Sequence, residues 1–197
     1  MSKSTHSSIE RPGKRERLVA SAQDLLHREG AAGPTLAEIA HAADVPPGNV
    51  YYYFKTRDEL VQAVVDAHAN AVDDLIAQLD ARPTPQARLK GLAESWTRNS
   101  ALVVEHGCPL GGLAHDLGRC DGELSAEGAR PLRTIVAWVE GQFRELKQRD
   151  ARVLAETYIS TIQGAALLAN AFGDERVLKQ QIRRLERWVD ALGQPTS

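Results

Sequence analysis

The sequence predicts an all-α protein with a small N-terminal domain followed by a larger helical domain. Apolar residues recur at helical spacing along nearly the whole chain, and no β-branched or aromatic run alternates with a period of two. Capping signals separate the helical runs. The 197 residues are enough to bury a core without disulfide or metal staples.

The N-terminal helices have recognisable boundaries. Apolar residues at helical spacing reach Gly30, which stops the first helix. Thr35 and Glu38 form a capping box, in which each side chain bonds the backbone of the other, so a short second helix begins there. Asp44 closes this second helix.

Two further signals place the third and fourth helices. The double proline 46–47 suits a first turn, so the third helix begins there and runs through Phe54. Thr56 and Glu59 predict a second capping box, which opens a helix of about six turns that ends at Asp80. We expect this long helix to link the two domains.

The remaining residues predict five more helices, nine in all. Residues 105–123 contain five glycines and a proline, which predict a turn, a short helix and another turn. Pro131 either sits early in its helix or bends it, Gly173 ends the next helix, and Asp174 caps the last one. We place these helices at about residues 85–103, 110–117, 125–148, 150–172 and 174–192.

The composition excludes several classes of protein. Hydrophobic residues make up 43% and charged residues 25%, which is not the composition of a disordered, collagen-like or disulfide-scaffold chain. The sequence has no apolar run of the length that spans a membrane, about 18 residues or more, and no apolar stretch of a secretory signal near its start. We therefore expect a cytoplasmic protein without a membrane partner.

The formal net charge of −2 hides a basic N-terminal part. Residues 1–57 hold eight Lys or Arg against six Asp or Glu, while the rest of the chain is acidic. This pattern permits contact with nucleic acid at the N-terminal end without requiring it.

Residues 35–54 have the organisation of a helix-turn-helix, the unit that reads DNA with its second helix. The positive end of that second helix suits a phosphate. Gly48 lets a backbone approach closely, and Asn49 can bond to phosphate or to an adenine edge.

The tyrosines 51–53 carry the strongest indication of an exposed surface. Val50 and Phe54 lie four residues apart and can anchor the helix, which leaves the tyrosines pointing in three directions. At least one must be exposed, offering a hydroxyl to phosphate and a ring to a thymine methyl, with Lys55 and Arg57 beside the phosphates. The alternative is a generic helical hairpin whose tyrosines pack in the core.

The stretches from Thr35 to Val45 and from Gly48 to Leu60 resemble the TetR/AcrR family of bacterial transcriptional regulators, over about residues 14–65. The resemblance implies a homodimer with N-terminal DNA-binding domains, a C-terminal ligand domain and usually repression of a nearby gene. It places at the operator DNA the residues Lys14, Arg15, Thr35, Pro47, Gly48, Asn49, Tyr51, Tyr52, Tyr53, Lys55 and Arg57.

Two positions depart from the family pattern. Asp44 stands where a glycine is usual between the two helices, which predicts slight strain in the turn. Tyr53 stands where a histidine is common, which puts that phosphate contact in doubt. With these departures we divide the chain into a flexible tail at 1–12, a DNA-binding domain at 13–57 and a ligand-binding and dimerisation domain at 58–197.

The helix at 150–172 is apolar on two faces, and a surface helix of a monomer needs only one. One stripe holds Leu154, Tyr158, Ile162 and Ala165, and the other holds Ala155, Ile159, Ala166 and Ala169. With the apolar seam of helix 174–192, this predicts an antiparallel four-helix bundle between two subunits. The alternative is that both helices are buried within one chain.

By the same resemblance, the helices at 85–103, 110–117, 125–148 and 150–172 enclose a cavity for a small, largely apolar inducer. The candidate lining residues are Trp96, Cys108, Leu113, Trp138, Phe143, Tyr158 and Gln163, and the alternative for each is ordinary core.

Cys108 has a second interpretation, as an oxidant or electrophile sensor. A helix N-terminus and His106 nearby would favour its thiolate, and similar Gly-Cys sites occur in sensing members of the family. The alternative is a small buried residue in a tight turn. A bridge to Cys120 is possible but unsupported, and a metal site from His106, Cys108 and His115 is disfavoured by its irregular spacing.

These observations predict a ligand-released repressor that binds a pseudo-palindromic operator as a dimer, with affinity that falls steeply with salt. The alternatives are a redox switch triggered at Cys108 and, in another class, a helical enzyme or interaction module. The sequence shows no catalytic triad, carboxylate pair, phosphate loop or HExxH pattern, so we expect neither catalysis nor a cofactor or metal.

Overall fold

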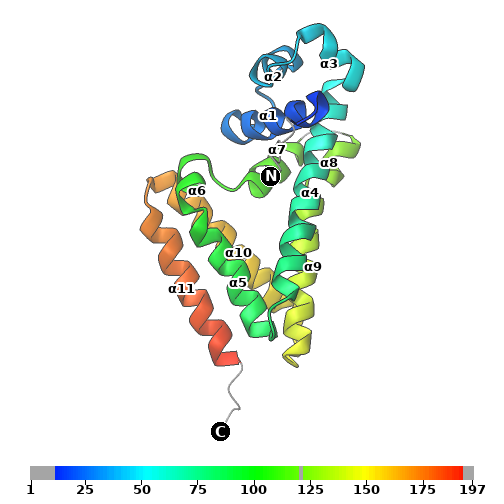
Figure 1. Cartoon of the computed structure of the whole chain (residues 1–197). Coiled ribbons are helices and arrows are strands. Elements are labelled where there is room, and N and C mark those ends of the chain that lie inside the picture. The colour runs from blue at the N-terminus through cyan, green and yellow to red at the C-terminus, as the bar shows by residue number, and fades with distance from the viewer. Residues whose placement is uncertain (1–11, 120–121, 193–197) are drawn as a thin grey trace, which may run out of the picture.

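The computed structural model describes residues 12–119 and 122–192, and these form a small helical unit above a helical bundle (Figure 1). The all-α fold class is confirmed. The helices are α1 Lys14–Glu29, α2 Leu36–Ala42, α3 Pro47–Tyr53, α4 Arg57–Asp80, α5 Pro85–Arg98, α6 Ser100–His106, α7 Pro109–Leu117, α8 Glu123–Glu127, α9 Arg130–Glu145, α10 Ala151–Phe172 and α11 Glu175–Leu192. The tail predicted at 1–12 lies, Pro12 apart, outside the described residues.

Two of the predicted helices are each divided in the structure, which gives eleven helical segments in the described part of the chain. The helix expected at 85–103 is interrupted at Asn99, where α5 ends and α6 begins. The helix expected at 125–148 is preceded by the separate five-residue α8. Pro131 lies in the first turn of α9, so it begins that helix and does not bend it.

The predicted capping box of α2 is present in full. The Thr35 hydroxyl accepts the Glu38 backbone N–H at 3.3 Å, and the Glu38 carboxylate accepts the Thr35 N–H at 2.8 Å. These bonds to Thr35 hold the pKa of the Glu38 carboxyl below its ordinary value.

The second capping box is present only in half. The Thr56 hydroxyl accepts the Glu59 N–H at 3.2 Å, but the Glu59 carboxylate accepts the backbone N–H of Lys55, at 2.6 Å, instead of that of Thr56. The prediction of a reciprocal box was therefore wrong, although it located the start of α4 correctly.

The core of the helix-turn-helix unit extends beyond α1, α2 and α3. It includes the first part of α4, from Leu60 to Val65, and two residues of α7, Leu113 and Leu117. The unit is thus packed against the larger domain through α7, although some fifty residues of chain separate α7 from α3.

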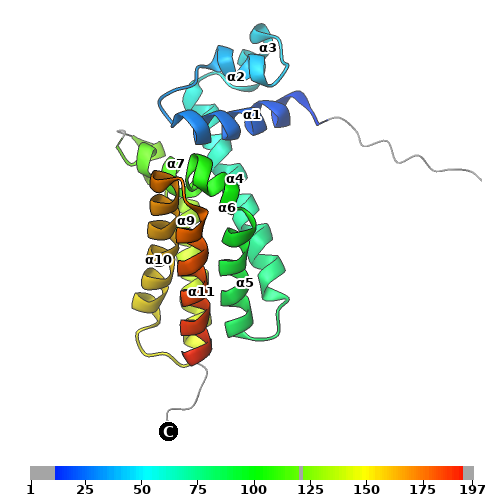
Figure 2. The same ribbon diagram turned by 90° about the vertical axis from the view of Figure 1, so that its left-hand side faces the viewer.

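The larger domain has its own core around α10, which packs against α9 and α11 (Figure 2). Tyr158 is fully buried, and its hydroxyl donates to the Leu89 carbonyl at 2.6 Å. The Tyr158 ring meets Phe143 edge-on, and Phe143 also contacts the Trp188 ring. Within the described residues, the longest apolar runs in the helices fall short of what a bilayer crossing requires.

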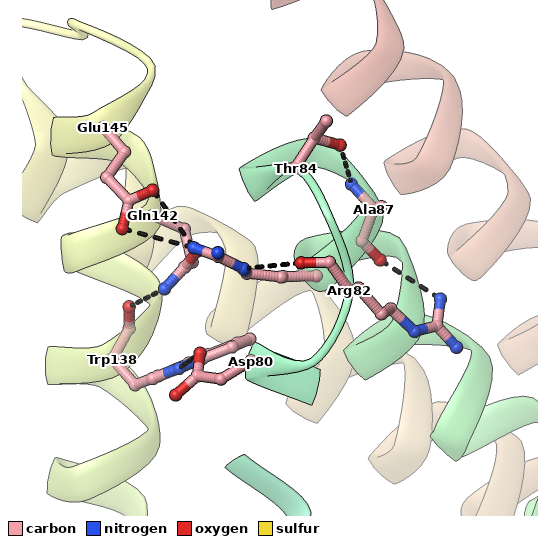
Figure 3. Close-up of polar contacts among 8 residues, drawn as sticks. Asp80, Arg82, Thr84, Ala87, Trp138, Gln142 and Glu145 are labelled. Atoms are coloured by element: carbon pink, nitrogen blue, oxygen red, sulfur yellow. Dashed lines mark hydrogen bonds and ion pairs between the residues drawn. The ribbon is translucent and has the colours of Figure 1, made fainter. Parts of the chain in front are cut away.

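The end of this domain farther from the helix-turn-helix is closed by polar side chains (Figure 3). The Arg88 guanidinium donates to the Gln142 side-chain oxygen at 3.2 Å and to the Glu145 carboxylate at 3.1 Å. The Trp138 indole donates to the Asp80 carboxylate at 2.9 Å. These bonds fasten the turn between α4 and α5 to α9.

Candidate DNA interface and ligand cavity

Helix α3 lies at the tip of the molecule (Figures 1 and 2). Val50 and Phe54 are buried and anchor it to the core. Tyr51 and Tyr52 are 57% and 78% exposed, whereas Tyr53 is half-buried with its ring edge-on to that of Tyr52. A core-packed hairpin, the alternative for this segment, does not expose two of its three tyrosines in this way.

The start of α3 is open to the outside. Pro46 and Pro47 begin the helix, and no side chain of the described residues caps it. A Cβ added to Gly48 would meet nothing within 4 Å, so internal packing does not require a glycine there. The space beside Gly48 therefore remains for an external group such as a phosphate.

The turn between α2 and α3 has the geometry that its sequence predicts. Asp44 has a φ of 52°, in the left-handed region that glycine adopts most readily. Its carboxylate pairs with the Arg17 guanidinium at 3.3 Å, which ties the turn to α1.

Two of the predicted cations, Arg15 and Lys55, lie at the C-terminal end of α3. Lys14 and Arg15 are exposed at the start of α1, and the Arg15 guanidinium lies 5.3 Å from the centre of the Phe54 ring. The Lys55 amine is exposed and donates to the Tyr51 carbonyl at 2.6 Å, at the end of α3.

Two predicted contact residues have internal partners. The Arg57 guanidinium donates to the backbone carbonyls of Pro34, at 3.2 Å, and Ala31, so it holds the loop before α2. The hydroxyl of Thr35 belongs to the capping box. For Arg57 this geometry favours a positioning role over direct contact with DNA.

The larger domain contains a mainly apolar cavity of about 320 Å³, which we call the main cavity. It lies between α1, α4, α5, α6, the start of α7 and α9. The lining residues are His27, His68, Ala71, Val72, Leu75, Leu92, Ser95, Trp96, Asn99, Leu102, Val103, Gly107, Cys108, Pro109, Leu110 and Ile135.

Of the seven predicted lining residues, the structure brings Trp96 and Cys108 to the main cavity, and Gln163 donates to the Cys108 sulfur at 3.5 Å. The other four lie elsewhere, which corrects the prediction. Leu113 lies in the core of the helix-turn-helix unit, and Trp138 bonds to Asp80 at the far end of the larger domain. Phe143 and Tyr158 are buried in the core of the larger domain.

The prediction missed the contributions of α1 and α4. His27 and His68 reach the main cavity from helices that the sequence assigned to the DNA-binding unit and to the linker. A histidine on an amphipathic helix carries no local signal for a cavity. Helices 125–148 and 150–172, expected to line it, contribute only Ile135.

Cys108 caps α7, and its sulfur accepts the Gly111 N–H at 3.2 Å. Burial raises the pKa of the Cys108 thiol, and the hydrogen bonds from Gly111, Gln163 and Leu110 offset this only in part. Desolvation therefore opposes the thiolate that a sensing role would need. The suggested bridge partner Cys120 lies outside the described residues. Over those that are described, no three His, Cys, Asp or Glu side chains gather as a metal site would need.

Helix α7 connects the main cavity to the helix-turn-helix unit. Its first residues line the main cavity, while Leu113 and Leu117 belong to the other core. The Asp116 carboxylate accepts the Ala31 N–H at 2.7 Å, in the loop that precedes α2. The main cavity and the DNA-reading unit therefore share one short helix.

This combination of an exposed reading helix and a hollow helical domain defines a helix-turn-helix transcriptional regulator. Residues 18–64 match the family model described as bacterial regulatory proteins, tetR family. The N-terminal part of the chain therefore carries the DNA-binding domain of the TetR/AcrR family of transcriptional regulators.

Similar proteins cover most of the chain. An uncharacterised HTH-type transcriptional regulator of Lactococcus lactis is 23% identical over 91% of this chain and 95% of its own length. The transcriptional regulator AcuR of Cereibacter sphaeroides is 26% identical, over 77% of this chain and 74% of its own. Among solved structures, a TetR transcriptional regulator from Legionella pneumophila superposes with a TM-score of 0.82 at 18% identity, covering 91% of this chain and 98% of the other, which shows the shared fold.

Proposed function

We propose that the protein is a cytoplasmic repressor that binds a pseudo-palindromic operator as a homodimer and is released by a small, largely apolar inducer. The observation that carries this proposal is the position of α7, which lines the main cavity at one end and enters the helix-turn-helix core at the other.

The DNA-binding part of the proposal assigns α3 to the major groove. Tyr51 and Tyr52 are the exposed groups that would meet bases and phosphates, with Asn49 beside them. Lys14 and Arg15 would contact the flanking backbone, where each neutralised phosphate adds to the salt dependence.

The dimer part rests on where apolar side chains are exposed. In the described part of the chain, seven large apolar side chains are exposed, and four of them lie on α10: Val153, Leu167, Leu168 and Phe172. An apolar surface of this kind favours a protein partner. The predicted second stripe needs correction, because Ala155, Ala166 and Ala169 are buried within the chain. A dimer through α10 and α11 would cover the four exposed residues.

In the release mechanism, an inducer in the main cavity acts on α7. It would contact Pro109 and Leu110. A shift of α7 would then move Leu113 in the helix-turn-helix core and strain the hydrogen bond from the Ala31 N–H to Asp116. The two α3 helices of a dimer would then lose the spacing that the operator requires. Coupling between two such sites is typically about 1–3 kcal/mol.

The decisive experiment is fluorescence anisotropy with the DNA upstream of the protein's own gene and with unrelated DNA. We expect preferential binding to the upstream DNA, with an affinity that falls steeply as salt rises. Tyr52→Ala should lose most of this preference. Arg149→Ala, which removes an exposed cation near the opposite end of the molecule, is the matched control. Equal binding to both DNAs at low salt would overturn the proposal.

A further inference from the structure

Two histidines stand at the end of the main cavity nearest the helix-turn-helix unit. His27 comes from α1 and His68 from α4. Both also line a smaller adjoining pocket of about 50 Å³, which holds His106 and Asp116 as well. One imidazole from each domain therefore faces the same space.

The hydrogen bonding of these two imidazoles is incomplete. His27 Nε2 lies 3.0 Å from the Gly107 carbonyl oxygen. Because a carbonyl only accepts, Nε2 carries a proton and Nδ1 remains for another partner. Hydrogen bonds are not among the causes of the pKa shift of His68. Burial lowers the pKa of His68, and the nearby His27 lowers it further. Each imidazole thus has capacity for a ligand.

The rest of the main cavity supplies no other charge. Among the described residues that line it, none is Lys, Arg, Asp or Glu, and most are apolar. Asp116, on the smaller pocket, already accepts the Ala31 N–H. The main cavity is therefore an apolar chamber with a pair of proton-accepting groups at one end.

We propose that the inducer is a small apolar carboxylic acid whose carboxylate binds between His27 and His68 and whose hydrocarbon part fills the space lined by Leu75, Leu92 and Trp96. This inference rests on the proposed function. A carboxylate in an apolar cavity needs donors and opposite charge. An imidazole that takes up a proton as the carboxylate binds supplies both, and the bound carboxylate offsets the burial that otherwise disfavours the charged form of His68. A neutral ligand gives the imidazoles no such partner.

The position of His27 gives such a ligand direct contact with the DNA-binding unit. A carboxylate bound to His27 and His68 joins α1 to α4 through the ligand, at a place where α1 already contacts Gly107. The helix-turn-helix unit would therefore contribute a residue to the inducer site.

The test compares octanoate, octanamide and 1-octanol, which share a hydrocarbon chain, by calorimetry on the full-length protein. We expect octanoate to bind about tenfold or more tightly than the other two, since hydrogen bonds to charged groups are the stronger ones. Its affinity should fall as the pH rises through the range in which His68 loses its proton, a range that begins below the ordinary imidazole value because burial lowers the pKa of His68. The affinity of 1-octanol should stay constant. The other groups that face the pair are His106 on α6, Asp116 on α7 and the Cys108 thiol.

Two variants assign the effect to the pair. His68→Gln should remove both the preference for octanoate and its pH dependence, and His27→Gln serves the same purpose if the first variant does not fold. His115→Gln, at an exposed histidine of α7, is the control and should keep both.

The outcomes separate this inference from the proposed function. Equal binding of the three compounds, or an unchanged preference in His68→Gln, overturns the acid-binding site and leaves the repressor standing. Binding of none of them overturns the acid-binding site as well. A failure to prefer the upstream DNA concerns the proposed function alone.

Discussion

The two ends of the larger domain are built differently. The end next to the helix-turn-helix unit is hollow, and its wall includes His27 and His68. The opposite end carries the hydrogen bonds of Arg88 and Trp138 (Figure 3). Phe143 and Tyr158 are fully buried in the core of the same domain. The cavity thus lies at the end of the domain that contacts the helix-turn-helix unit, and the densely hydrogen-bonded end lies away from it.

The largest test of this contrast is a pair of truncations, one at each end. Phe143→Ala should destabilise the protein by about 3–5 kcal/mol, because Phe143 is fully buried against Tyr158 and Trp188. Trp96→Ala should cost only about 1–2 kcal/mol, since Trp96 is half-buried and already borders open space. Urea denaturation measures both, and equal losses would contradict the contrast.

The next largest effect is expected at the contact between α7 and the loop before α2. Asp116→Ala removes the acceptor of the Ala31 N–H and should cost about 1–2 kcal/mol. It should also weaken the effect of an inducer on DNA affinity. Anisotropy with and without inducer measures that coupling, and a variant with undiminished coupling would show that α7 is not the connection.

The polar closure of the far end should contribute less. Arg88→Ala breaks the bonds to Gln142 and Glu145, but the Glu145 side chain is half exposed, so the expected loss is at most about 1 kcal/mol. A shift in the urea midpoint that shrinks as salt rises would agree with this. A loss of stability as large as that of Phe143→Ala would show that these polar bonds, and not the apolar core, stabilise that end of the domain.

The smallest expected effect concerns the thiol at the hollow end. Since burial raises the pKa of Cys108 above its ordinary value, little thiolate forms near neutral pH. Iodoacetamide should alkylate Cys108 in the folded protein much more slowly than in urea, and the folded rate should rise only at higher pH. Peptide mapping separates Cys108 from Cys120. Fast alkylation at neutral pH would restore the sensor interpretation.

The features that the sequence predicts well depend on neighbours in the chain. The capping box of Thr35 and Glu38, the start of α3 at the double proline and the left-handed Gly173 that ends α10 all follow from contacts within a few residues. The exposed tyrosines follow from helical geometry alone. At Thr56 the same reasoning was half wrong, because the Glu59 carboxylate accepts the N–H of Lys55, one residue before the one expected.

The all-α fold, the helix-turn-helix and the outward-facing α3 follow from the sequence alone, because turns, caps and helix faces are set by residues close together in the chain. Which side chains line the main cavity depends on how the helices pack. His27, His68, Trp96 and Cys108 come from separate helices, and they meet because packing brings those helices together. The same packing placed Tyr158 and Phe143 in solid core, since a buried aromatic ring and a cavity wall leave the same pattern in a sequence.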